Sequence, residues 1–396
     1  MPNGSASLRT IYISDTTLRD GEQMPGASLN VSDKVRISRA LAEAGVTSID
    51  AGFPACAQSE IDAIKRIIAE APGPLISALC RTMPADIDKA YEALAEARPD
   101  KRSVSLFVGT SALHLRYKLR RSVPELLNLV RSSIEYARQH FELVSFSPED
   151  ASRTEPGVLC TIYREAIDAG ARVIGFPDTV GILTPSGVRR FVRTIQDEVP
   201  NFGNCRLAGH FHNDLGLATA NALAALEEGV PIIQCTVNGI GERAGNTALE
   251  EVAIALALHG QEMGLMSTID SAKLWPLCRL VSELTGIPLA PNKPVAGDNI
   301  FATEAGIHQD GLLKHPDTYL PYRPERIGGP RVRLVLGKHS GRAAICDRLR
   351  TLDLEVKDSD LDQVIEIAKS APKEAWNNDR ELLAAAVAVV RAGSDA

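Results

Sequence analysis

Short runs of β-branched and aliphatic residues alternate with longer amphipathic stretches from the N-terminus to about residue 258. The expected strands are 10–14, 47–51, 75–79, 103–108, 141–147, 172–176, 205–212 and 232–237. The expected helices are 33–44, 59–70, 85–97, 124–139, 156–169, 185–198, 217–228 and 247–258. Eight strand–helix units of this length predict an α/β fold, a TIM (β/α)8 barrel. An open, doubly wound sheet is the competing architecture, but no Gly-rich dinucleotide turn follows the first strand.

The alternation ends after residue 258, where helical material leads into a Pro/Gly/Asn-rich link at 291–297. We therefore expect three parts: a catalytic barrel over 9–258, a linker and helical subdomain over 259–300, and a smaller, mainly helical C-terminal lid region over 301–396.

Composition excludes several classes of partner. The net charge is −7 and charged residues make up 23% of the chain, so there is no basic excess to bind nucleic acid or an anionic membrane. No apolar run reaches membrane-spanning length, and the N-terminus lacks the apolar core of a secretory signal. The seven cysteines are scattered and form no C-x-x-C pair, which is typical of a reducing compartment. We expect a cytoplasmic protein.

Two histidines, His210 and His212, close the seventh expected strand. Residues i and i+2 of a strand project from the same face, so both imidazoles would point at one spot. Imidazole is the commonest transition-metal ligand, so the pair predicts a metal site; the alternative is two polar residues that meet water and backbone at a strand end.

Polar clusters also follow four other expected strands, and catalytic groups of a barrel come from the C-terminal ends of its strands. These clusters are 15–23, 147–150, 177–181 and 238–246. Helix caps and turns use the same residue types, but capping alone does not explain why all of them converge on one rim.

Five motifs, in order, resemble the 2-isopropylmalate synthase and homocitrate synthase family. They are DTTLRDGEQ (15–23), HFHNDLGLA (210–218), NGIGERAGN (238–246), GIHQDGLLK (306–314) and LGKHSGR (336–342). The resemblance covers about residues 10–345 and implies a metal-dependent, Claisen-condensing acyltransferase built on a TIM barrel. Longer members carry a C-terminal domain for leucine feedback, which we do not expect in this chain.

The resemblance also implies roles for individual residues. The ligands of a divalent cation (Mn, Mg, Zn or Co) would be Asp20, His210 and His212, with Asn246 nearby, although Asn246 could equally cap a helix. Such a cation would bind a 2-oxo acid and polarise its ketone. The expected catalytic residues of the barrel are Arg19, which would bind the developing oxyanion, and Glu149. The expected substrate-binding residues are Gln23, Ser147 and Thr179.

Acetyl-CoA is the co-substrate that the resemblance implies, and its methyl group must lose a proton. His308 is the candidate base, with Tyr319 as its companion, in a lid that reaches the partner's barrel in a homodimer. His339 could bind CoA or only pack. His114, His140, His259 and His315 are expected to be surface or structural residues.

Two departures from the family pattern indicate which oxo acid to expect. Ser105 occupies the place of a strand-four histidine of isopropylmalate synthases, and Asp50 the place of a glutamate. These departures favour a homocitrate synthase-like enzyme that uses 2-oxoglutarate or another anionic oxo acid, with Arg81, Arg116 or Arg120 as the cation for its second acidic group. The alternatives are 2-isopropylmalate synthase with 3-methyl-2-oxobutanoate, citramalate synthase and 2-(phosphonomethyl)malate synthase.

Two other classes compete with a synthase. A lyase or aldolase such as 3-hydroxy-3-methylglutaryl-CoA lyase would share the barrel and metal centre but differ in the C-terminal motifs. A non-catalytic metal or acyl-CoA binding protein would leave Arg19, His308 and Tyr319 without a role.

Overall fold

The computed structural model describes residues 8–394 and divides the chain into two compact units, 1–289 and 290–396. Each unit is considered separately below. Among the residues described, no helix is both long and apolar enough to cross a membrane.

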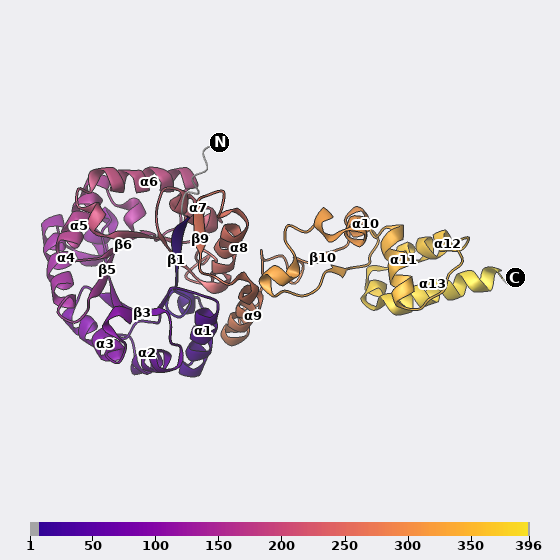
Figure 1. Cartoon of the computed structure of the whole chain (residues 1–396), viewed down its shortest axis with the longest axis horizontal. Coiled ribbons are helices and arrows are strands. Elements are labelled where there is room, and N and C mark those ends of the chain that lie inside the picture. The colour runs from indigo at the N-terminus through magenta and orange to yellow at the C-terminus, as the bar shows by residue number, and fades with distance from the viewer. Residues whose placement is uncertain (1–7, 395–396) are drawn as a thin grey trace. The chain divides into compact units, whose positions relative to one another are not determined.

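The first unit is a closed parallel barrel (Figure 1). Its strands are β1 (Arg9–Asp15), β2 (Ser48–Asp50), β3 (Leu75–Arg81), β4 (Arg102–Gly109), β5 (Leu143–Glu149), β6 (Val173–Asp178), β7 (Arg206–Phe211) and β8 (Ile232–Cys235). They pair in chain order, and β1 pairs with both β8 and β2, which closes the ring. The predicted TIM barrel is therefore confirmed.

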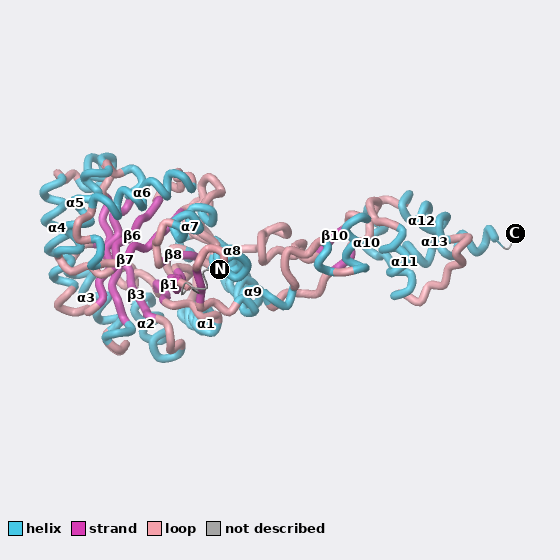
Figure 2. The backbone as a smooth tube through the Cα atoms, turned by 45° about the horizontal axis from the view of Figure 1, so that its top comes forward, coloured by secondary structure: helices cyan, strands magenta, loops and turns pink. Residues whose placement is uncertain are grey.

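Eight helices surround these strands, as the tilted view in Figure 2 shows. They are α1 (Val31–Glu43), α2 (Gln58–Glu70), α3 (Pro84–Leu94), α4 (Val123–Ala137), α5 (Pro156–Asp168), α6 (Pro185–Glu198), α7 (Ala218–Glu227) and α8 (Leu249–His259). Local sequence sets several of their starts: Asn30 and Ser122 each form a capping box with the acidic residue three positions later.

The main core lies between strands and helices. Alternate strand residues such as Leu106, Phe146 and Phe176 are fully buried there, and the ring of Phe176 stacks on Phe191 of α6. The residues between them on each strand face the barrel interior instead, because successive side chains of a strand point to opposite faces. This alternation decides which side chains can reach a site at the end of the barrel.

The first unit continues past the eighth helix. β9 (Leu265–Ser267) pairs in parallel with the start of β1, and α9 (Leu274–Thr285) contacts α1. Part of the segment expected to be a linker thus belongs to the compact unit that contains the barrel. The functional division of the chain into barrel, linker and lid stays a prediction.

The second unit has its own core. It comprises β10 (Ala302–Thr303), β11 (Arg333–Leu334), α10 (Gly306–Lys314), α11 (Arg342–Thr351), α12 (Leu361–Ser370) and α13 (Asp379–Ser394). Apolar side chains of α11, α12 and α13 pack together, among them Ile345, Val364 and Leu383. A mainly helical C-terminal region is as the sequence predicts.

Candidate active site

Three potential metal ligands meet where β1 and β7 end. Asp20 lies in the loop after β1, His210 is the penultimate residue of β7, and His212 follows that strand. One ligand atom of each lies within 4.8 Å of the others, and all three residues are buried. Asp20 Oδ2 is 3.6 Å from His210 Nε2, which is 3.2 Å from His212 Nε2. The two imidazoles therefore converge, as expected from their spacing, although β7 ends one residue before His212.

The residues fit a divalent cation. Burial lowers the pKa of His210 to about 3 and also lowers that of His212, so both rings are neutral donors at neutral pH. Among the described residues, the buried His212 Nδ1 and Asn246 Oδ1 have no hydrogen-bond partner. Asn246 Nδ2 donates to Asp20 Oδ1 at 2.7 Å, which places this asparagine next to the carboxylate ligand. One carboxylate and two imidazoles leave coordination positions for a substrate.

Arg19 joins this cluster through two carboxylates. Its Nη1 donates to Asp20 Oδ2 at 2.6 Å and its Nε to Asp50 Oδ2 at 2.8 Å. Burial disfavours the charged form of Arg19, but the charges of Asp50 and Asp20 outweigh it and raise the pKa of Arg19. Burial likewise opposes ionisation of Asp20, yet the charge of Arg19 holds the pKa of Asp20 below its usual range. Arg19 is thus a fixed cation beside the candidate metal ligands.

Asp50 and Gln234 support the cluster. The sequence indicated Asp50 as a departure from the family pattern but not its bond to Arg19, and it did not indicate Gln234. Asp50 ends β2 and is 3% exposed. Gln234 of β8 lies opposite His210 in the strand register and hydrogen-bonds to it. Such partners fix the orientation of a ligating imidazole. Only the pairing of β7 with β8 reveals Gln234, whereas the sequence had already singled out Asp50 as the residue in the place of a family glutamate.

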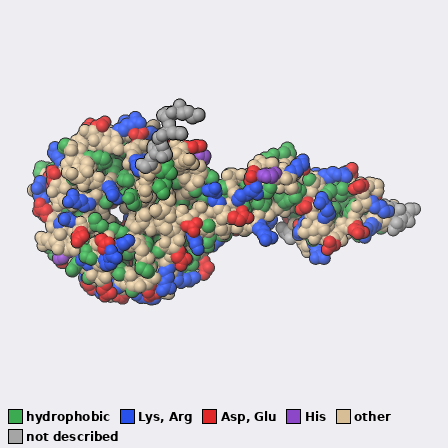
Figure 3. All heavy atoms as spheres, viewed as in Figure 1, with side chains coloured by type: hydrophobic (Ala, Val, Ile, Leu, Met, Phe, Trp, Pro, Cys, Tyr) green, Lys and Arg blue, Asp and Glu red, His purple; other side chains and the backbone are tan. Residues whose placement is uncertain are grey.

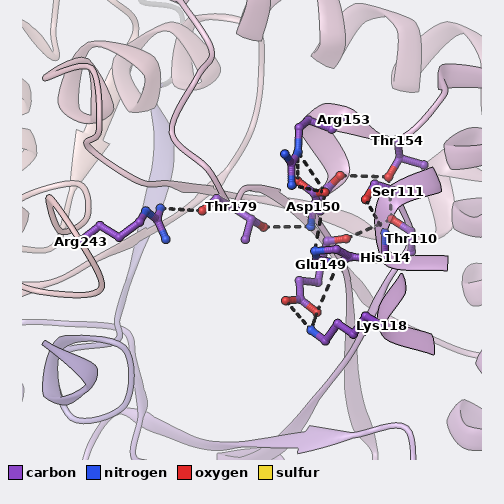
Figure 4. Close-up of polar contacts among 10 residues, drawn as sticks. All are labelled: Thr110, Ser111, His114, Lys118, Glu149, Asp150, Arg153, Thr154, Thr179 and Arg243. Atoms are coloured by element: carbon purple, nitrogen blue, oxygen red, sulfur yellow. Dashed lines mark hydrogen bonds and ion pairs between the residues drawn. The ribbon is translucent and has the colours of Figure 1, made fainter. Parts of the chain in front are cut away.

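Ser147, Glu149 and Thr179 lie around the ends of β5 and β6. A Cβ at Gly175 would fall 2.1 Å from Ser147 Oγ, so the serine packs over a position where only glycine fits. Thr179 Oγ1 accepts a hydrogen bond from the Asp150 amide at 2.9 Å, and its carbonyl accepts one from Arg243 at 2.7 Å (Figure 4). These bonds leave the hydroxyl hydrogen of Thr179 available to a ligand.

The other candidate substrate-binding residues are exposed or contact residues outside the metal-ligand cluster. Gln23 is exposed. Arg81 is bound by Asp86 through two hydrogen bonds of 2.7 and 2.9 Å, and Arg116 lies over the ring of Tyr117 at 5.0 Å. At the place of the strand-four histidine, Ser105 Oγ is 2.9 Å from Ser145 Oγ.

His308 and Tyr319 belong to the second unit. Their rings stack with centroids 4.1 Å apart, and both residues are exposed. Gln309, the residue after His308, is fully buried and donates to the carbonyls of Thr303 and Val335. His339 is exposed, and its carbonyl accepts from the Gly306 amide at 3.1 Å, so its motif packs on the start of α10.

Fold and site together define a class of protein: a TIM barrel with a candidate metal centre of one aspartate and two histidines at the strand ends. The chain belongs to the HMGL-like family, whose model matches residues 10–281. A second model, homocitrate synthase post-HMGL domain-like, matches residues 295–375. The predicted family is therefore confirmed.

Within this family the chain is similar to proteins named 2-isopropylmalate synthase. That of Rhodopirellula baltica is 44% identical over 378 residues, which cover 95% of this chain and 71% of the relative. That of Pyrococcus abyssi is 42% identical, over 95% of this chain and 77% of the relative. Among solved structures, hydroxymethylglutaryl-CoA lyase from Pseudomonas aeruginosa shares the fold, with a TM-score of 0.60 and 24% identity over 72% of this chain and 95% of that chain.

Proposed function

We propose that this protein is an acyltransferase that condenses the acetyl group of acetyl-CoA with a 2-oxo acid and then hydrolyses the thioester. The observation that carries this proposal is the buried cluster of Asp20, His210 and His212 with Arg19 beside it, in a chain 42–44% identical to 2-isopropylmalate synthases. Asp20, His210 and His212 would hold a divalent cation, which supplies Lewis-acid polarisation of a ketone when bound.

The chain's own groups account for the remaining chemistry. The bonds from Arg19 to Asp20 and Asp50 use Nη1 and Nε, so further N–H groups of the guanidinium can bind the oxyanion as charge develops. Ser147 and Thr179 would donate hydroxyl hydrogens to the substrate carboxylate. His308, with Tyr319, would take the proton from the acetyl methyl group, in the barrel of a partner subunit. The dimer, the cytoplasmic location and the metal's identity stay predictions.

For the oxo acid we propose 3-methyl-2-oxobutanoate, one of the alternatives that the sequence left open, in place of the anionic oxo acid that the departures from the family pattern favoured. The relatives named 2-isopropylmalate synthase support this choice, whereas none of the relatives described above is named homocitrate synthase. Two of the three cations considered for a second acidic group also have other contacts, since Arg81 is held by Asp86 and Arg116 lies over Tyr117.

The test is thiol release from acetyl-CoA with added Mn²⁺ or Mg²⁺ and a panel of oxo acids: 3-methyl-2-oxobutanoate, 2-oxoglutarate, pyruvate and phosphonopyruvate. We expect release only with both metal and oxo acid, fastest with 3-methyl-2-oxobutanoate. His210→Ala should lower the rate by about 1,000-fold or more, since a ligand is lost. His259→Ala, at a histidine whose side chain is 63% exposed, is the matched control.

Release of CoA without an oxo acid would contradict a synthase. Fastest turnover of 2-oxoglutarate would contradict the choice of oxo acid while leaving the reaction class intact. Equilibrium dialysis of Mn²⁺ checks the metal site independently of turnover, with loss of binding expected in His210→Ala.

A further inference from the structure

A lysine from the loop after β4 contacts Glu149, the candidate catalytic carboxylate at the end of β5. Lys118 Nζ is 2.8 Å from Glu149 Oε1 and 2.6 Å from Oε2, so it binds both oxygens (Figure 4). Lys118 lies in a short π-helical segment, His114–Leu119, between β4 and α4. The lysine is 31 positions from Glu149 in the sequence, so only the barrel brings them together.

The strand register explains how the segment reaches Glu149. Gly109, which ends β4, pairs with Glu149, and the next amide, that of Thr110, donates to the Glu149 carbonyl at 3.0 Å. The chain then turns back over this point, where Ser111 Oγ accepts from the His114 amide at 3.2 Å. A Cβ at Gly109 would fall 2.5 Å from His114 Nδ1, so the glycine makes room for the imidazole.

The residue after Glu149, Asp150, is restrained by several hydrogen bonds. Asp150 has a left-handed backbone, with φ of 68°, which is uncommon for a residue other than glycine and requires support. Arg153 supplies it with hydrogen bonds of 2.8 to 3.1 Å to the fully buried Asp150 carboxylate. Thr154 Oγ1 donates to the Asp150 carbonyl at 3.0 Å. The backbone that carries Glu149 is therefore restrained on its C-terminal side.

The side chain of Glu149 is restrained mainly by Lys118. Among the described residues, two other titratable groups form ion pairs with Glu149 or Asp150. His114 Nδ1 is 3.9 Å from Glu149 Oε2 and its Nε2 is 3.8 Å from Asp150 Oδ2, and Arg153 Nε is 2.8 Å from Asp150 Oδ1. The Lys118 side chain is 50% exposed and that of Glu149 22%. An ion pair this open to water adds little to stability, but its place on the catalytic rim of the barrel favours a role in the site.

We propose that Lys118 is a positioning residue that holds the Glu149 carboxylate at the mouth of the barrel and anchors segment 114–119 there. The inference rests on the proposed function and on the catalytic role that the sequence predicts for Glu149. A carboxylate that must meet a reacting group within a fraction of an ångström needs such a second contact, because its own side chain has free rotamers.

The test compares Lys118→Met with Lys89→Met. Lys89 pairs with Glu92 at 2.8 Å on α3 and is also 50% exposed, but it lies away from the strand ends. We expect Lys118→Met to lower kcat by about tenfold or more, with little change in the KM for acetyl-CoA and a melting temperature within about 2 °C of the wild type. Lys118→Arg should keep most of the activity, since a guanidinium can bind both carboxylate oxygens.

A double-mutant cycle with Glu149→Gln separates positioning from an independent effect. If Lys118 acts through Glu149, the double variant loses no more activity than Glu149→Gln alone. Hydrogen exchange of amides 115–119 gives a readout that needs no turnover: Lys118→Met and Glu149→Gln should each speed exchange, without adding.

Two results would overturn the inference: additive losses in the cycle, or wild-type exchange rates in Lys118→Met. A wild-type enzyme that releases no thiol with any oxo acid would instead contradict the proposed function, and the exchange data would then decide whether the pair anchors the segment.

Discussion

At the scale of single residues, a few hydrogen bonds stabilise the ionised form of a carboxyl group that is buried beside the candidate site. Asp15, the last residue of β1, is fully buried and accepts from the Thr17 amide at 2.9 Å and the Thr17 hydroxyl at 2.8 Å. The same hydroxyl accepts from the Val237 amide, which ties the loop after β1 to the loop after β8. Burial outweighs these bonds and raises the pKa of Asp15 to about 7.

This pKa predicts how stability depends on pH. Between about pH 4 and 7 the folded protein retains the Asp15 proton that the unfolded chain has lost, so this group's contribution to stability falls as the pH rises. Asp15→Asn keeps an acceptor for Thr17 but cannot ionise. We expect its free energy of unfolding, relative to wild type, to rise by roughly 2–3 kcal/mol between pH 5 and 8. Urea denaturation at both pH values measures this; a constant difference would contradict it.

At the scale of elements, the loop after β8 shapes the candidate metal centre. Gly241 has φ of +155°, and a Cβ there would lie 2.1 Å from Asn246 Nδ2 and 3.0 Å from Asp20 Oδ1. His212 and Asn246 form an isolated bridge, so this loop also contacts the end of β7. The close approach of the loop backbone thus holds Asn246 against the Asp20 carboxylate.

Gly241→Ala tests this arrangement. We expect it to weaken Mn²⁺ binding by about 10- to 100-fold, because Asn246 and Asp20 must shift, and to lower stability by about 1–3 kcal/mol through backbone strain. Gly264→Ala is the control: Gly264 has φ of +68°, but nothing lies within 4 Å of its added Cβ. Equilibrium dialysis measures metal affinity, and equal losses in both variants would show that strain alone is responsible.

At the scale of the molecule, two units divide the candidate chemistry. Residues 1–289 contain the three candidate metal ligands, Arg19 and Glu149, whereas His308 and Tyr319 belong to 290–396. Along the surface seen in Figure 3, acidic and basic side chains are interspersed, in keeping with a net charge of −7 and no basic excess.

A chain that ends at Leu289 tests this division. We expect it to unfold cooperatively and to bind Mn²⁺ with nearly wild-type affinity, because it retains β9, α9 and every candidate ligand. Thiol release should fall by about 100-fold or more, since the base is lost, and full-length His308→Ala should show the same fall. Wild-type turnover by the shortened chain would exclude His308 from the reaction.

Much of the fold could be predicted from sequence because its signals are local. Strands 103–108 and 75–79 were expected within three residues of β4 and β3, since burial on the helix-facing side selects alternate apolar residues. The spacing of His210 and His212 likewise indicated that both rings point to one place. Local patterns did not predict contacts that depend on which strands are neighbours, such as that between Gln234 and His210.

The sequence by itself determined the eight strand–helix units, the histidine pair and the family motifs, since these depend on residues a few positions apart. Only the tertiary structure brought Asn246 to Asp20, 226 positions away, and Lys118 to Glu149. The physical reason is closure of the barrel. Its strand register brings the loops after β1 and β8, and those after β4 and β5, to one rim, and no periodicity along the chain encodes which of their side chains touch.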